Sequence, residues 1–124
     1  MSPTAWVDDP KITDETVLWR RIDQSQIRIH DNGSTSISSA AFLTQQMSVH
    51  IAHKTDLLTA LGKYPGHRLA AFKAGVVRAV GCIVVADPIE DDPSHAIVCR
   101  ADDHTKRISK GQAKHIASHA TLIV

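Results

Sequence analysis

His95 stands where an acidic, proline-containing loop meets an apolar run, in the stretch VADPIEDDPSHAIVCR of residues 85–100. A histidine side chain can give or take a proton near neutral pH, so His95 is the candidate general acid or base of this chain. Other polar side chains also lie within or beside apolar runs, and we take them as candidate ligand-binding residues: Arg20, Arg21, Ser38, Ser39 and Ser48.

These residue types suit the binding of an anion. A guanidinium offers a two-pronged donor to phosphate or carboxylate, and hydroxyl groups donate to anionic oxygens. Burying such groups without partners costs on the order of 1 to 3 kcal/mol each, so we expect them to bond one another or to line a wet pocket. The sequence therefore predicts a pocket for a phosphate- or carboxylate-bearing small molecule or nucleotide, with His95 catalysing hydrolysis or group transfer.

Each of these residues also has a purely structural interpretation. Ser38 and Ser39 can cap the turn that follows them, Ser48 can face solvent, and Arg20 can pair with an acidic neighbour. His95 can hydrogen-bond the backbone of its own acidic loop. On this interpretation the domain is a non-catalytic interaction module, acting as an accessory subunit or as a dimer.

Eight histidines in a short chain raise the question of a metal ion. A helical spacing would place His115 and His119 on one face, and His50 lies close to His53 in sequence. Zinc needs three or four ligands, however, and no glutamate follows His115 in the HExxH manner. We therefore assign no metal ligands and predict no particular cofactor.

Composition bounds the class of protein. The chain has 124 residues, of which 43% are hydrophobic and 22% charged, so we expect one soluble globular domain. Its formal net charge of +1 creates no strong field toward nucleic acid. One basic cluster comprises Lys106, Arg107, Lys110 and Lys114, and without interleaved aromatic residues it predicts weak, salt-sensitive contact at most.

The sequence also carries expectations about compartment. The first residues, MSPTAWVDDPKITDE, have acids and prolines where a secretion signal needs a basic and then an apolar stretch. No apolar run approaches the roughly 20 residues that cross a bilayer. We expect a cytoplasmic protein without membrane partners, in which Cys82 and Cys99 are small buried hydrophobes.

The sequence of the first half of the chain predicts an arm followed by strands. Residues 1–14 predict an N-terminal arm pinned by Trp6, and residues 15–124 a single α+β domain. A strand is expected over 16–22. Asn32-Gly33 predicts a tight hairpin turn between two strands, with Ile27, Ile29 and Ile37 inward. Alternation predicts another strand over 47–52.

The second half mixes helices with strands. Thr55 is the expected cap of a short helix ended by Gly62, and Tyr64-Pro65-Gly66 predicts a turn. Strands are expected over 69–73, 82–86 and 94–100, with a short helix over 74–80. A capping box of Ser109 and Gln112 predicts a last helix to about residue 120, with Ile108, Ile116 and Ala120 inward.

These elements predict a compact α+β fold. We expect an antiparallel or mixed sheet of about five or six strands, with two or three short helices packed on one face.

Overall fold

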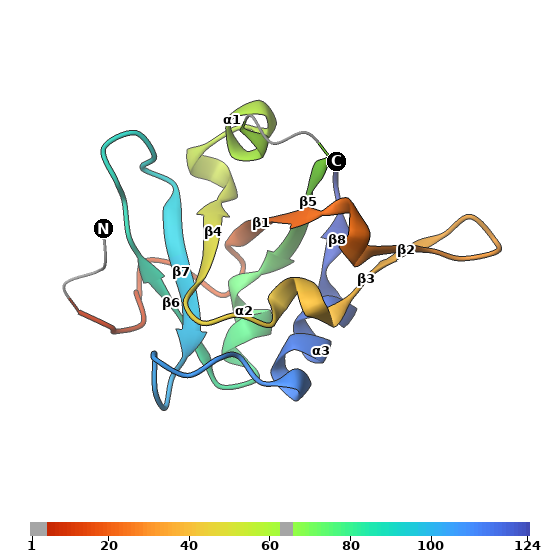
Figure 1. Cartoon of the computed structure of the whole chain (residues 1–124). Helices are drawn as coiled ribbons and strands as arrows, with labels where there is room; N and C mark the ends of the chain where they lie inside the picture. Colours follow the sequence, from red (N-terminus) through yellow and green to blue (C-terminus); the bar gives the residue numbers. More distant parts are fainter. Residues whose placement is uncertain (1–4, 63–65) are drawn as a thin grey trace.

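The structure is a computed structural model that describes residues 5–62 and 66–124. Within these residues the chain forms one α+β domain built on a six-stranded sheet (Figure 1). The strands of this sheet are β1 (Val17–Asp23), β4 (Met47–Ile51), β5 (His67–Lys73), β6 (Cys82–Ala86), β7 (His95–Arg100) and β8 (Thr121–Leu122). Their order across the sheet is β6-β7-β4-β1-β5-β8, and every neighbouring pair is antiparallel. The predicted fold class is confirmed.

A separate two-stranded sheet projects from the body. It consists of β2 (Ile27–Ile29) and β3 (Thr35–Ile37), joined by the expected turn in which Gly33 has φ +83°. Ile27 and Ile37 pair with each other and are 9% exposed. The prediction that Ile29 faces inward is wrong, because Ile29 is 72% exposed. The hairpin projects away from the rest of the domain (Figure 1), and most of the Ile29 side chain is exposed to solvent.

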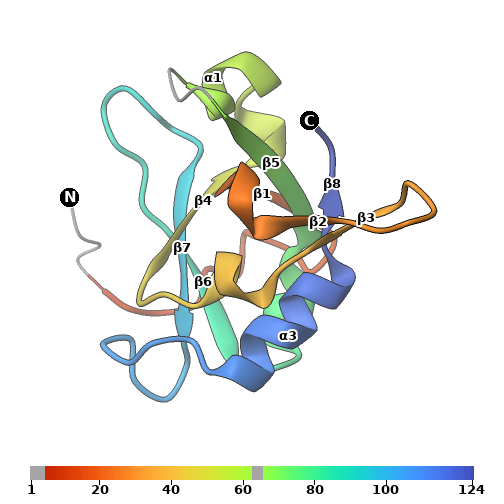
Figure 2. The same cartoon turned by 45° about the vertical axis from the view of Figure 1, so that its right-hand side comes forward.

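Two helices pack against one face of the large sheet, where they contribute buried side chains to the main core. The helices are α1 (Leu57–Leu61), α2 (Ala74–Arg78) and α3 (Lys110–His119), with single 3-10 turns η1 (Gln24–Gln26), η2 (Ser39–Phe42) and η3 (Ala52–Lys54). Figure 2 shows α3 beside η2 and the base of the hairpin. The side chains of the main core come from β1 to β7, η2, α2 and α3, and the largest fully buried ones include Leu18, Met47, Phe42, Val77 and Ile116.

Local signals explain where the helices begin. Ser109 accepts a hydrogen bond from the backbone of Gln112, whose side chain accepts one from the backbone of Ser109, so the predicted capping box begins α3. The cap of α1 is Asp56, one residue after the expected Thr55, because the Asp56 carboxylate accepts the N–H of Thr59 at 2.8 Å. Tyr64 and Pro65 of the expected turn lie outside the described residues.

The N-terminal segment lies along the sheet edge formed by β6. Asp9 donates its backbone N–H to the carbonyl of Val84, and the Asp8 carboxylate accepts the N–H of Val84, both at 2.9 Å. The same carboxylate oxygen lies 3.1 Å from Nε of Arg78. Ile12 is buried in the main core, and Trp6 stacks on His104 with ring centroids 4.4 Å apart.

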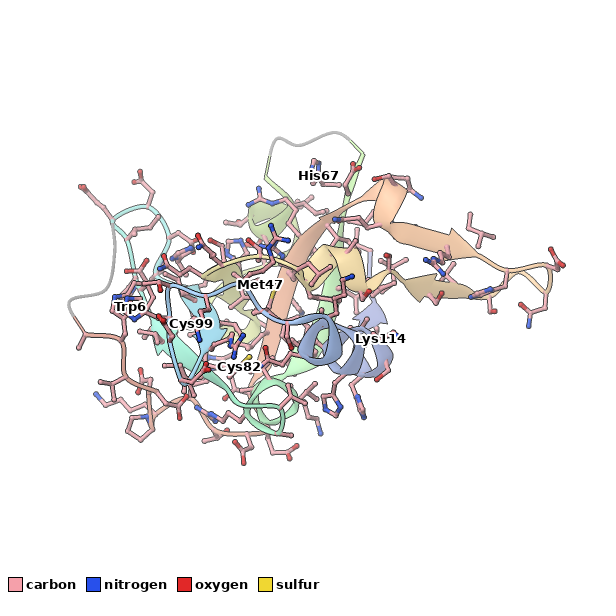
Figure 3. All side chains as sticks on the ribbon, turned by 60° about the horizontal axis from the view of Figure 1, so that its bottom comes forward. Trp6, Met47, His67, Cys82, Cys99 and Lys114 are labelled. Atoms are coloured by element: carbon pink, nitrogen blue, oxygen red, sulfur yellow. The ribbon has the colours of Figure 1, made fainter. Side chains whose placement is uncertain are left out.

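The opposite face of the sheet is only partly apolar. Val85, Ile97 and Cys99 form a small cluster there, against Trp6 and Ile83. Cys82 and Cys99 are both buried with free thiols (Figure 3). No helix among the residues described has the length and apolar character that a membrane crossing needs.

Candidate functional site

A polar hollow opens on this less apolar face of the sheet. Its volume is about 410 Å³, and we call it the β1–β4 hollow. Its lining comes from β1, β4, β5, β7 and the loop between β6 and β7: Arg20, Arg21, Ser48, His50, His67, Ile89, Asp92 and His95. Four of the six residues proposed from the sequence therefore lie around one hollow.

The hollow forms where two neighbouring strands separate. β1 and β4 are paired at only two positions, Leu18 with Ile51 and Trp19 with His50. Beyond Trp19, β1 continues its ladder with β5, while β4 continues its ladder with β7. Backbone carbonyls on the β4 side of this gap therefore need other donors.

Arg20 supplies those donors. Its Nη1 donates to the carbonyl of Ser48 at 3.0 Å, and its Nε donates to the carbonyl of Ala41 at 3.4 Å. Burial lowers the pKa of Arg20, and the charge of Arg21 acts in the same direction, but a guanidinium keeps its proton in proteins. Arg20 thus holds the two sides of the gap together and places a positive charge next to Ser48.

His95 is held on both sides of its ring. Its Nδ1 lies 3.1 Å from the backbone carbonyl oxygen of Asp87 and 3.1 Å from Oδ2 of the same residue. Its Nε2 lies 3.3 Å from Oγ of Ser48. The His95 side chain is 18% exposed and that of Asp87 is 7% exposed. The hydrogen bond to the loop backbone agrees with the structural interpretation of His95. That interpretation did not include a contact between His95 and Ser48.

The contact between His95 and Asp87 fixes the position of a proton. A carbonyl oxygen only accepts hydrogen bonds, so Nδ1 of His95 carries the proton and the neutral ring presents a lone pair at Nε2. Ser48 must then donate its hydroxyl to Nε2. Within the described residues, Oδ2 of Asp87 is buried and accepts no hydrogen bond, so its negative charge faces the imidazole at close range. That charge stabilises positive charge that develops on the ring during proton transfer.

His50 is arranged in the same way on the neighbouring strand. Its Nδ1 lies 3.1 Å from Oγ of Ser94 and 3.1 Å from Oδ2 of Asp92. The Ser94 hydroxyl donates its proton to the Asp92 carboxylate. Both oxygens next to Nδ1 of His50 therefore act as hydrogen-bond acceptors. Burial lowers the pKa of His50, and nearby Arg21 and His95 lower it further, while Asp92 opposes the shift. His50 is therefore held neutral at physiological pH.

The structure separates Ser38 and Ser39 from this site. Ser38 begins η2, where its Oγ accepts the N–H of Ala40 at 3.3 Å. Both serines line a different hollow, of about 320 Å³, together with Arg28 and Lys114. Lys114 is on α3, below the base of the hairpin (Figure 3). The sequence grouped them with His95 because all are polar residues within or beside apolar runs, but Ser38 and Ser39 lie on the α3 side of the molecule.

Several lining residues were not predicted from the sequence. His50 was considered only as a possible metal ligand, although the alternation over 47–52 already placed Ser48 and His50 on one face. Asp92 and Asp87 belong to the loop that precedes His95, and proximity in sequence was the available signal. His67 pairs with Asp23 across β5 and β1, and no sequence pattern pointed to it.

The metal hypothesis finds no support in the residues that the structure describes. Across 5–62 and 66–124, no three histidine, cysteine, aspartate or glutamate side chains gather as a metal ion requires. His115 and His119 do lie together on α3, with ring centroids 4.4 Å apart, but Nδ1 of His119 contacts the carbonyl of His115 at 2.9 Å.

Fold and site together define an α+β domain with two carboxylate-flanked histidines at a polar hollow. Comparisons with protein-family models, with curated proteins and with solved structures give no match to this chain. Function must therefore be argued from the side chains of the site.

Proposed function

We propose that the β1–β4 hollow binds a phosphate- or carboxylate-bearing small molecule and that His95 acts as general base and acid in its hydrolysis or transfer. The observation that carries the proposal is the proton arrangement of His95. Its Nδ1 is committed to the carbonyl of Asp87, so the basic nitrogen of the neutral ring is Nε2, which lies 3.3 Å from Oγ of Ser48. A base with its lone pair aimed at a hydroxyl is arranged for proton transfer.

The charges around the hollow support an anionic ligand. Arg20 and Arg21 both line it, and guanidinium groups place positive charge where phosphate or carboxylate would bind. The carboxylate of Asp92 also lines the hollow, but it lies 3.1 Å from Nδ1 of His50 and accepts from Ser94. Its charge is therefore turned toward its own loop, while the two arginines supply positive charge to the ligand.

A thermal-shift screen tests the proposal with inorganic phosphate, nucleotides, sugar phosphates, dicarboxylates and divalent metal ions. A ligand present at a hundred times its Kd stabilises the folded state by about 2.7 kcal/mol, which raises Tm by several degrees. We expect such a shift with at least one anion, and its loss in R21M and in H95A. The matched control is H30A, because His30 also bonds a serine but lies on the exposed hairpin.

Two results would contradict the proposal. The first is that no anion raises Tm in the wild type. The second is that H95A and H30A respond to the anion as the wild type does, which would remove His95 from the site. Either result would favour the interaction module, and the oligomeric state of the wild type would then be the next measurement.

A further inference from the structure

Ser48, His95 and Asp87 form a continuous series of polar contacts that leads from solvent into the protein. Oγ of Ser48 lies 3.3 Å from Nε2 of His95, and Nδ1 of the same ring lies 3.1 Å from both oxygens of Asp87 named above. Ser48 is exposed, His95 is mostly buried and Asp87 is buried. The hydroxyl is thus open to a ligand in the hollow, while the groups behind it are shielded from water.

The direction of the hydrogen bonds in this series matters for reactivity. Because the carbonyl of Asp87 fixes the proton of His95 on Nδ1, Nε2 can only accept from Ser48. A serine hydroxyl is a weak nucleophile until a neighbouring base removes its proton as it attacks. His95 is placed to remove that proton, so Ser48 differs chemically from an ordinary surface serine.

Arg20 adds the stabilisation that such an attack requires. Its Nη1 donates to the backbone carbonyl of Ser48 at 3.0 Å, so its positive charge lies next to the backbone of the residue that carries the nucleophile. Attack of Oγ on an acyl carbon puts one negative charge on one oxygen, next to that nucleophile. Two nitrogens of Arg20 already bond backbone carbonyls, so the guanidinium is held in place before substrate arrives.

We infer that Ser48 is the covalent nucleophile of an acyl-transfer reaction, acting on an ester that carries an anionic group. This inference rests on the proposed function of the hollow, because Arg21 would hold the anionic group. Oγ bonds to the acyl carbon while its proton passes to Nε2 of His95. The bond from carbon to the leaving alcohol breaks as Nε2 returns that proton to the alcohol. Water then gives a proton to Nε2 and attacks the acyl-serine, and Oγ leaves with the proton.

A fluorophosphonate reagent tests the nucleophile directly, since an activated serine attacks its phosphorus and releases fluoride. We expect one equivalent to bind the wild-type chain, located at Ser48 by peptide mass spectrometry. S48A and H95N should each lower the labelling rate by about 100-fold or more. In H95N the amide can still donate to the Asp87 carbonyl but offers no base at Nε2, so the loop contact is preserved.

The hairpin provides a control within the same chain. Oγ of Ser36 lies 2.9 Å from Nε2 of His30, which is closer than the corresponding distance at Ser48. His30 and its hairpin are exposed, and there the ring has no counterpart of Asp87 among its contacts in the described residues. We expect no labelling of Ser36. Equal labelling of Ser36 and Ser48 would show that the reagent responds only to the proximity of a serine and a histidine. That result would overturn the inference.

A second variant tests the basicity of His95 without an ester. In S48C the new thiol would lie next to Nε2, and we expect iodoacetamide to alkylate it at pH 7 about tenfold faster than in S48C/H95N. The native thiols give a low background, because burial raises the pKa of Cys82 to about 11, with Cys99 adding to the shift, and burial likewise raises the pKa of Cys99 to about 11. Equal alkylation rates in S48C and S48C/H95N would count against His95 as the base that acts on this side chain.

Failure of this inference is distinguishable from failure of the proposed function. If Ser48 is not labelled although an anion still raises Tm in an H95A-sensitive way, the hollow binds its ligand but Ser48 is no nucleophile. If neither labelling nor a ligand-induced shift is seen, both proposals fall. Labelling at Ser48 that persists unchanged in H95N would also overturn the inference.

Discussion

His50 on β4 and His95 on β7 are directly paired across the two neighbouring strands, and each ring has its Nδ1 beside oxygen atoms that accept its proton. Because β4 and β7 are hydrogen-bonded neighbours, the two rings share one face of the sheet. Burial lowers the pKa of the His50 ring, and the neighbouring Arg21 and His95 act in the same direction.

The first prediction concerns pH. The pKa of His50 is lowered from its ordinary value of 6.5 chiefly by burial, so the unfolded chain takes up this proton before the folded chain does. Stability therefore falls as pH decreases below about 6.5, until the folded-state pKa is passed. We expect the free energy of unfolding, from urea denaturation at fixed ionic strength, to decrease between pH 7 and pH 5.

The variant H50N isolates this contribution. Its side-chain amide can donate toward Asp92 as Nδ1 does, but it does not titrate. The decrease in stability between pH 7 and pH 5 should therefore be smaller in H50N than in the wild type. An identical pH dependence of the unfolding free energy in the two proteins would mean that the burial of His50 does not contribute to it.

A second prediction concerns Arg20. Replacement by methionine keeps much of the apolar stem but leaves the carbonyls of Ser48 and Ala41 without their donor, which we expect to cost about 1 to 3 kcal/mol in unfolding free energy. R20K should recover part of that loss. The control R28M changes an exposed arginine of the hairpin and should stay within about 0.5 kcal/mol of the wild type. A cost for R20M no larger than that of R28M would contradict this account.

The hairpin gives a matched pair of substitutions. Ile27 is 9% exposed and Ile29 is 72% exposed on the same short strand. Truncating a buried isoleucine to alanine costs about 2 to 5 kcal/mol, whereas truncation at an exposed position costs about 0.5 kcal/mol or less. We expect I27A to fall toward the lower end of the first range and I29A to be near neutral, by urea denaturation. Equal losses would place the hairpin tip against the body instead.

The capping box of α3 gives a further prediction. S109A removes the oxygen that accepts the backbone N–H of Gln112, and loss of such a cap costs about 1 kcal/mol. S118A is the control, since Ser118 bonds within the exposed surface of the same helix, to the carbonyl of His115. Thermal unfolding should show a lower Tm for S109A than for S118A, and the reverse order would be inconsistent with the cap.

The elements with strong local patterns could be predicted from the sequence. Alternation identified β4, and the capping box identified α3, because these signals act within a few residues. Ile29 shows where the pattern fails, because alternation assigns a face to a side chain but not whether that face meets another layer. β8 has only two residues and forms because the end of α3 lies beside β5, which is a tertiary effect.

The site depends on information that local patterns do not contain. Ser48 and His95 are 47 residues apart, and they meet because β4 lies between β7 and β1. No local pattern in the sequence indicates this lateral order of strands. Ser38 and Ser39 are nearer to Ser48 along the chain, yet they line another hollow, because η2 places them on the opposite side of the sheet from His95.

The segment along β6 bears on how the protein behaves at high concentration. An outer strand with free backbone groups is a template for pairing with another molecule. Both backbone groups of Val84 are occupied by Asp8 and Asp9, and Arg78 anchors the same carboxylate. Residues 5–16 form no helix or strand of their own, yet through Asp8 and Asp9 they cover the outer edge of β6 at Val84, so these two backbone groups are not available for pairing with a strand of a second molecule.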